Sequence, residues 1–141
     1  MAGVPLTLKV RRLRFTRGVR TVLRSIDGMT PELLSWYARQ VEGGAFFAVG
    51  FFDRARLVCV ALTEEQSGPR GRELMVVASA GGVRGVDLTA TVLGHLEAMA
   101  RADGYRAIRF ETRRQGLVRR TVLLGYTFGR VVMEKELGPC A

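Results

Sequence analysis

ELMVVASAGGVRGVDLTATVLGHLEAMA, residues Glu73–Ala100, changes its hydrophobic period partway along. Glu73–Ser79 is an apolar run of the strand type, and from Asp87 onward the apolar residues recur one helical turn apart. A glycine-rich loop joins the two patterns. The stretch therefore predicts a strand, a loop and a helix, and leaves open whether the loop holds a phosphate group or is only a turn.

The segments on either side of this stretch predict its neighbours in the sheet. YRAIRFET (105–112) is a second strand, and a strand–helix–strand connection of this kind is right-handed with parallel strands. Upstream, AFFAVGFF (45–52) and RLVCVAL (56–62) form an antiparallel hairpin around Asp53-Arg54-Ala55. The second of these runs is apolar on both faces, which indicates a central strand.

The remaining elements follow from local signals. Leu6–Phe15 alternates apolar and polar residues as a half-exposed strand does, whereas residues 17–24 are ambiguous. Thr30-Pro31-Glu32 is a helix start, and Gly43-Gly44 ends that helix. EEQSGPRGR (64–72) has the composition of a loop. We predict a short basic helix over 114–125 and a final strand or hairpin over 126–137.

These elements define the expected fold class and domain organisation. The order predicts an α/β (α+β) fold with a mixed, mostly antiparallel sheet, a central parallel βαβ unit and helices on both faces. The 141 residues form one domain, in which 1–29 is a basic strand or arm and 30–137 is the core. Phenylalanines crowd both faces of the hairpin, so a helix or a partner subunit must cover one of them.

The charge of the chain points to anionic partners. Its 22 basic and 13 acidic residues give a net charge of +9. Such a field favours nucleic acid, an acidic protein surface or a phosphorylated cofactor, although a solvated basic face is the simpler interpretation. The candidate contacts form two arginine clusters, one near the N-terminus and one on the late helix: Arg11, Arg12, Arg14, Arg17, Arg113, Arg114, Arg119 and Arg120.

Other site classes find little support in the sequence. Cys59 and Cys140 belong to no CxxC motif or Cys/His cluster, so we expect no metal. His95 lies on the apolar stripe of its helix and has no catalytic partner in the sequence, so we interpret it as a helix-face or interface residue. The N-terminus lacks the apolar region of a signal peptide, and no apolar run approaches the length of a membrane span. We expect a soluble protein that is cytoplasmic or packaged within a larger particle.

The order and lengths of the elements over residues ~30–137 resemble the GNAT superfamily of acyl-CoA-dependent N-acetyltransferases. Three stretches carry the resemblance: the hairpin 45–62, the strand–loop–helix unit, and the next strand and helix ending in Leu124-Gly125-Tyr126. In that family the loop reads Gln/Arg-x-x-Gly-x-Gly/Ala and binds a pyrophosphate. The resemblance implies acetyl-CoA contacts from the strand and the loop, at Val76, Val77, Ala78, Gly82, Val83, Arg84 and Gly85.

Two departures from the family pattern bear on activity. Asp87 stands where a second Gly or Ala is expected, and its carboxylate would both cap the helix and repel phosphates. Counting back four residues from Gly125 places Thr121 where the family carries a catalytic Tyr, and a Thr hydroxyl is a poor acid. We therefore name no catalytic residue, and acetyl-CoA binding and the absence of any cofactor remain equal alternatives.

Three functions stay open at this point. The departures favour a GNAT-fold binding or structural module with protein partners or a homo-oligomeric state. The Arg-rich composition and Arg113–Gly116 are similar to short GNAT-like proteins encoded among phage structural genes, which implies a virion or assembly component. The alternative is an acetyl-CoA-dependent N-acetyltransferase acting on an amine. A basic nucleic-acid-binding module is the third.

Overall fold

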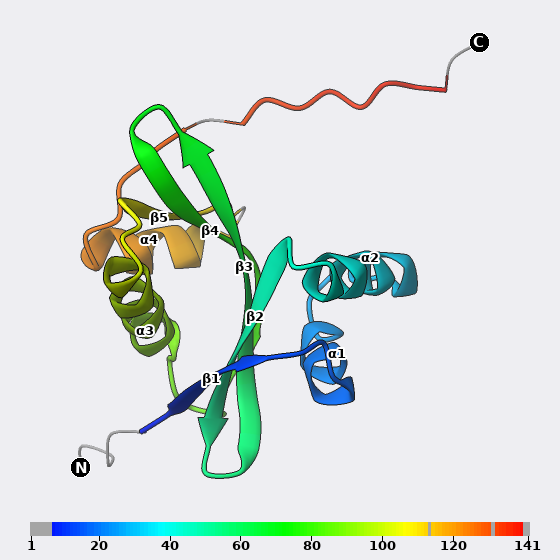
Figure 1. Cartoon of the computed structure of the whole chain (residues 1–141), viewed down its shortest axis with the longest axis vertical. Coiled ribbons are helices and arrows are strands. Elements are labelled where there is room, and N and C mark those ends of the chain that lie inside the picture. The colour runs from blue at the N-terminus through cyan, green and yellow to red at the C-terminus, as the bar shows by residue number, and fades with distance from the viewer. Residues whose placement is uncertain (1–6, 113, 131, 140–141) are drawn as a thin grey trace.

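The computed structural model describes residues 7–112, 114–130 and 132–139, and within them five strands form one sheet (Figure 1). The strands lie side by side in chain order: β1 (Lys9–Leu13), β2 (Phe46–Asp53), β3 (Arg56–Gly68), β4 (Gly71–Gly81) and β5 (Ala107–Phe110). All neighbours are antiparallel except β4 and β5, which are parallel. The mixed sheet, the hairpin and the central position of β3 are therefore confirmed.

Helices cover both faces of this sheet, as predicted (Figure 1). On one face α1 (Arg17–Leu23) and α2 (Pro31–Glu42) pack, and on the other lie α3 (Thr89–Ala102) and α4 (Gln115–Leu123). The ambiguous segment 17–24 is thus mostly helical. Because side chains alternate along a strand, β3 feeds both layers: Val60 and Leu62 face α1 and α2, whereas Cys59 and Ala61 face α3.

The start of α2 follows the sequence signal. The Thr30 hydroxyl oxygen accepts a hydrogen bond from the Leu33 backbone N–H at 3.1 Å, and Pro31 occupies the first helical position. Gly43 then caps the end, and Gly44 follows with φ +81°. A left-handed backbone of this kind costs a glycine little, so the chain can turn directly into β2.

Residues 64–72 correct the prediction of a loop. The two strands continue through this segment, because β3 runs to Gly68 and β4 begins at Gly71. Both strands are largely solvent-exposed here, so their composition is polar. A cross-strand ion pair joins Arg72 Nη1 to Glu65 Oε1 at 2.8 Å. The polar composition that resembled a loop belongs to the projecting tip of a hairpin.

Residues 126–137 correct a second prediction. The described residues after α4, 126–130 and 132–139, contain no helix or strand, and we call them the tail. The tail passes the β3–β4 hairpin and runs out from the domain (Figure 1). Since it adds no strand, the parallel βαβ unit lies at one end of the described sheet and not at its centre. Within the described chain, this segment has no neighbouring strand with which to pair.

Candidate functional site

The two parallel strands separate where β5 ends. They pair from Glu73 opposite Ala107 to Val76 opposite Phe110, after which β4 continues to Gly81 paired with β3 but not with β5. At the same point β4 carries a bulge: Leu62 and Thr63 of β3 face Ala78 and Val76, so Val77 is the extra residue. A bulge bends its strand and redirects its side chains, so β4 turns away from β5 there.

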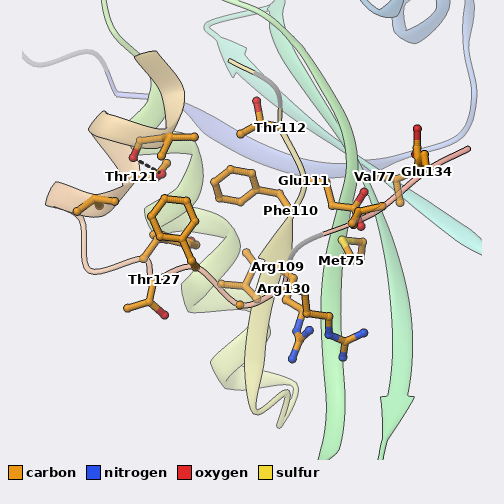
Figure 2. A pocket seen from close by; sticks show the side chains of 17 residues that line it. Met75, Val77, Arg109, Phe110, Glu111, Thr112, Thr121, Thr127, Arg130 and Glu134 are labelled. Atoms are coloured by element: carbon orange, nitrogen blue, oxygen red, sulfur yellow. Dashed lines mark hydrogen bonds between the residues drawn. The ribbon is translucent and has the colours of Figure 1, made fainter. Parts of the chain in front are cut away.

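A cavity of about 880 Å³ occupies this opening and extends along β5 (Figure 2). We call it the β4–β5 cavity. Its size falls within the usual range for small-molecule sites, and it lies at the carboxyl ends of two parallel strands, where open α/β sheets bind ligands. Its walls come from β4, β5 and the chain just after it, α4 and the tail: Met75, Val77, Ile108–Thr112, Val118, Thr121, Val122, Tyr126–Arg130, Val132 and Glu134.

A charged cluster lies beside this cavity. Glu73 is buried, with 7% of its surface exposed, and its carboxylate accepts hydrogen bonds from Arg106 Nη2 at 2.6 Å and pairs with Arg109 Nε at 2.7 Å. The Arg106 hydrogen bond, with the charges of Arg109, Arg106 and Arg130, holds the pKa of Glu73 below its ordinary value. Two guanidinium groups thus contact this carboxylate, and the charge of a third, that of Arg130, acts on it as well.

The residues predicted to hold a cofactor do not all meet at this cavity. Val77 lines it. Val76 and Val83 pack against the core beneath α3, and Ala78 packs on the opposite face. The other three predicted residues, Gly82, Arg84 and Gly85, are exposed on the loop before α3. Their contact with a phosphate group therefore remains a prediction.

The loop itself is a tight turn. Val83 and Val86 form an isolated antiparallel bridge, and Gly85 between them has φ +77°. The Gly82 N–H donates to the Val58 carbonyl at 2.8 Å, so the backbone of the loop is tied to the end of the sheet. A side chain built on Gly82 or Gly85 would meet nothing within 4 Å, so space for an incoming group is available at both.

The Asp87 side chain accepts a backbone hydrogen bond at the start of α3, as we expected for an aspartate at this position. Its Oδ1 accepts a hydrogen bond from the Thr89 backbone N–H at 3.0 Å, although Leu88 is the capping residue itself. This bond, helped by the positive charge of Arg120 on α4, lowers the pKa of the Asp87 carboxyl. One backbone N–H at the start of α3 is therefore already bonded to the Asp87 side chain. The Arg120 guanidinium of α4 is close enough for its charge to act on the Asp87 carboxylate.

Neither hydroxyl near the end of α4 is presented as an acid. Thr121 is 3% exposed, and its hydroxyl donates to the Leu117 carbonyl of its own helix at 2.9 Å. The Tyr126 ring lines the cavity and packs against Phe110 at 5.5 Å. Its hydroxyl is buried without a hydrogen bond of ordinary geometry among the described residues, and burial, with the charge of nearby Glu97, raises its pKa.

The predicted arginine contacts form two separate groups. Arg11 and Arg12 on β1 stack over Phe52 and Phe47, at 5.8 and 3.8 Å, and Arg14 and Arg17 follow as exposed residues. The other group lies on or next to α4, at the far end of the sheet: Arg114, Arg119 and Arg120. Arg113 lies outside the described residues. The two groups do not make one continuous surface.

Sequence reasoning missed the Glu73 cluster and the contribution of the tail to the cavity. The spacing of charged residues along the two strands could have pointed to the Glu73 cluster, because side chains two residues apart lie on the same face of a strand. In parallel register, Glu73 and Met75 on β4 lie opposite Ala107 and Arg109 on β5. His95, on α3, packs its ring against Phe51 at 6.0 Å and takes no part in the cavity.

The described residues form neither a metal-binding cluster nor a helix that could span a membrane. In residues 7–112, 114–130 and 132–139, no three His, Cys, Asp or Glu side chains come close enough to hold a metal ion. Within the same ranges, no helix combines the length and the apolar composition needed to cross a bilayer.

Among the comparisons with known proteins, only the one with solved structures gives matches. No protein-family model and no curated protein matches the sequence. Among solved structures, a possible acetyltransferase from Clostridium difficile 630 is similar with a TM-score of 0.73 at 8% identity, over 94% of this chain and 99% of that one.

Two further structures cover the chain equally well. An aminoglycoside N-acetyltransferase in complex with CoA has a TM-score of 0.70 at 8% identity, over 96% of this chain and 99% of that one. Glucosamine-6-phosphate N-acetyltransferase from Arabidopsis thaliana has a TM-score of 0.67 at 14% identity, over 94% and 99%. At such identities the likeness concerns the fold alone: this chain has the GNAT acetyltransferase fold.

Proposed function

We propose that this protein binds an acyl-CoA, such as acetyl-CoA, between β4 and β5 and transfers the acyl group to an amine. The separation of the two strands at the Val77 bulge carries the proposal. Beyond Val76 the backbone of β4 has no paired strand on its β5 side within the described residues, so its N–H and C=O groups can bind an extended ligand. The pantetheine arm of CoA is such a ligand, with amides along its length.

The phosphates would then lie near the start of α3. The exposed loop residues Gly82 and Gly85 leave room for them, and Arg84 offers a cation. Arg120 on α4 adds a second cation, because its charge already acts on Asp87. Two guanidinium groups thus offset the one carboxylate that opposes an anion at this end of the helix.

Glu111 is the side chain that we propose as the base. It follows the last paired residue of β5, is exposed, and lines the β4–β5 cavity. In the reaction the amine nitrogen forms a bond to the thioester carbonyl carbon, the carbon–sulfur bond breaks, and the amine proton must leave. Glu111 would accept that proton, and the thiolate would take one from solvent, because the Thr121 hydroxyl is turned into its own helix.

A second function, a binding or structural module without catalysis, is favoured by two observations. Asp87 already accepts the Thr89 N–H at the helix start, and Thr121 offers no free acid. Such a module could serve in an assembly, including a virion. The two functions differ in one measurable property, the affinity for CoA.

Isothermal titration with acetyl-CoA and with CoA separates these alternatives. We expect binding by the wild-type chain and its loss in Val77→Asp, which places a charge inside the cavity. Ala45→Asp is the matched control, since Ala45 is exposed between α2 and β2, outside the cavity and away from the loop before α3. Absence of binding by the wild-type chain would exclude the transferase. A gain of binding in Asp87→Gly would then identify the blocking carboxylate and support the non-catalytic module.

Thiol release during incubation with acetyl-CoA and a panel of amines tests the chemistry. We expect Glu111→Gln to lower kcat by on the order of 100-fold while the affinity for acetyl-CoA stays unchanged. Glu42→Gln, on the exposed end of α2, serves as the control. An equal turnover in wild type and Glu111→Gln would remove Glu111 as the base and leave positioning as the source of the rate.

A further inference from the structure

One end of the molecule carries many cations and few acids. Residues 9–24, which include β1 and α1, contain seven basic residues and no Asp or Glu. The turn between β2 and β3 lies at the same end, opposite the tip of the β3–β4 hairpin, and adds Arg54 (Figure 1). The nearest acids along the chain are Asp27 and Asp53. We call six of these cations the β1–α1 basic surface: Lys9, Arg11, Arg17, Arg20, Arg24 and Arg54.

Side-chain geometry directs these cations to one side of the sheet. Lys9, Arg11 and Leu13 are spaced two residues apart, so they share a face of β1. Leu13 packs into the core that α1 and α2 cover, which places Lys9 and Arg11 on the α1 side. On α1 itself the three arginines are spaced three and four residues apart, at 17, 20 and 24, so they form one stripe of the helix.

A pocket of about 350 Å³ lies within this surface. It is lined by Lys9, Arg11 and Arg54, together with Phe52 and Ala55, so its described walls carry three cations and no acid. Cations that converge on one hollow repel each other, and an anion bound between them removes that cost. The pocket therefore favours a ligand with a phosphate group.

The arginines of the β4–β5 half are neutralised within the chain, whereas these are not. Arg72 pairs with Glu65, and Arg106 and Arg109 pair with Glu73. In the part of the chain that the structure describes, no cation of the β1–α1 basic surface has an acidic partner of this kind. The fold therefore leaves their charge for an external anion.

Aromatic rings hold two of these guanidinium groups in place. The Arg11 guanidinium carbon lies 5.8 Å from the centre of the Phe52 ring, and that of Arg20 lies 5.5 Å from the centre of the Phe15 ring. A guanidinium stacked on a ring directs its N–H groups outward from its edge, where they remain available as donors. The surface thus presents positioned donors, and less side-chain entropy is lost when an anion binds.

The composition of the surface distinguishes between classes of anionic partner. None of the exposed large apolar residues in the described ranges belongs to β1, α1 or the β2–β3 turn. A protein interface has an apolar core, and a membrane-binding surface inserts apolar side chains. A phosphate backbone needs only cations and N–H donors, and the arginine fork fits its oxygen atoms. Nucleic acid is therefore the favoured partner.

We propose that the β1–α1 basic surface binds the phosphate backbone of a nucleic acid. One phosphate occupies the pocket between Lys9, Arg11 and Arg54, and neighbouring phosphates lie along the arginine stripe of α1. The surface begins at the β1 edge of the sheet, whereas the β4–β5 cavity lies at the β5 edge, so this site is separate from the one proposed for acyl-CoA. Contacts to phosphates make the affinity depend strongly on salt and little on base sequence.

Fluorescence anisotropy with a labelled DNA duplex tests the proposal on the full-length chain. Each phosphate contact contributes about −0.9 to the slope of log K against log salt concentration. Arg11→Glu/Arg54→Glu should make this slope shallower by about two and lower the affinity by on the order of 100-fold. Arg70→Glu/Arg101→Glu is the matched control, because it changes the net charge equally at exposed positions on the β3–β4 tip and the end of α3.

The charge-preserving variant Arg11→Lys/Arg54→Lys separates a loss of charge from a loss of folding, since it should keep the wild-type slope. The proposal is overturned by a wild-type chain that binds neither the duplex nor a single-stranded RNA, or by equal losses in the two glutamate variants. Binding to phosphatidylserine vesicles without binding to nucleic acid would assign the surface to a membrane and overturn it as well.

Acetyl-CoA distinguishes this site from the proposed cofactor site. Arg11→Glu/Arg54→Glu should bind acetyl-CoA as the wild type does, and an excess of acetyl-CoA should leave the duplex bound. Displacement of the duplex by acetyl-CoA would place the nucleic acid at the start of α3 and refute the proposal. A chain that binds the duplex but no acetyl-CoA would remove the transferase function and leave the nucleic-acid site standing.

Discussion

The β2–β3 half of the sheet and the β4–β5 half are built differently. Along β2 and β3 the middle residues are buried on both faces, between α1 and α2 on one side and α3 on the other. All four residues of β5 are only half-buried, and the β4–β5 cavity opens beside them. The difference separates two roles: the packed half supplies stability, and the open half leaves room for a ligand at a cost in packing.

The largest expected effect compares a phenylalanine from each half. Phe51→Ala on β2 should lower the free energy of unfolding by about 3–5 kcal/mol, because its ring is fully buried and truncation leaves a cavity. Phe110→Ala on β5 should cost roughly half as much, since that ring is half-buried beside open space. Urea denaturation of both variants measures the difference. Equal costs would mean that the open half is as well packed as the other.

The end of β4 offers a sharper test, with two adjacent glycines. A Cβ on Gly81 would lie 2.2 Å from the Val58 carbonyl oxygen, and Gly81 has φ +102°. Both the clash and the backbone angle oppose a side chain, so Gly81→Ala should destabilise the fold by about 3 kcal/mol. Gly82→Ala meets nothing within 4 Å and should change stability by less than about 0.5 kcal/mol. Thermal unfolding of the two variants measures this difference in stability.

The Glu73 cluster predicts how the open half responds to acid. The pKa of the Glu73 carboxyl is lower in the folded chain than in the unfolded chain, where it is near 4.5. The ion pairs therefore stabilise the fold fully above pH 4.5, and this contribution is lost as the pH falls through the pKa of the folded chain. Between pH 6 and 3 the wild-type chain should therefore lose more stability than Glu73→Gln. Urea midpoints across this range provide the measurement, and Glu42→Gln on α2 should keep the wild-type slope. Parallel curves for wild type and Glu73→Gln would contradict the assignment.

The smallest expected effect concerns the basic edge of the packed half. The Arg12 guanidinium lies 3.8 Å from the centre of the Phe47 ring, so Arg12→Ala should cost about 0.5–1 kcal/mol. Arg14→Ala removes the same charge from a neighbouring exposed position and should cost less. If both variants instead weaken binding to single-stranded DNA, with a steep dependence on salt, the β1 arginines act as an anionic-partner contact.

Local signals in the sequence were enough to predict most of the elements and their pairing. Thr30-Pro31 located the start of α2, and the change of period between Glu73 and Leu88 located the parallel pair and its crossover. These signals work because capping and side-chain alternation involve only neighbouring residues. The polar segment 64–72 misled for the same reason, since an exposed hairpin tip has the composition of a loop.

The candidate site was less accessible to sequence reasoning. Val77 was predicted as a contact from the family resemblance, but the bulge that makes it the turning point of β4 appears only in the register with β3. Glu73 lies 33 residues from Arg106, with which it shares a hydrogen bond, and no local pattern joins them. Such contacts depend on which strands become neighbours, and tertiary packing decides that.

The amino-acid sequence therefore determined the order of most elements, the mixed sheet, the helices on both faces and the positive charge, because each depends on composition or on residues close along the chain. The tertiary structure alone decided where β4 and β5 separate, which side chains line the opening, and that the tail leaves the sheet without adding a strand. Strand register and exposure arise from contacts between residues far apart in the chain, and these exist only once the chain has folded.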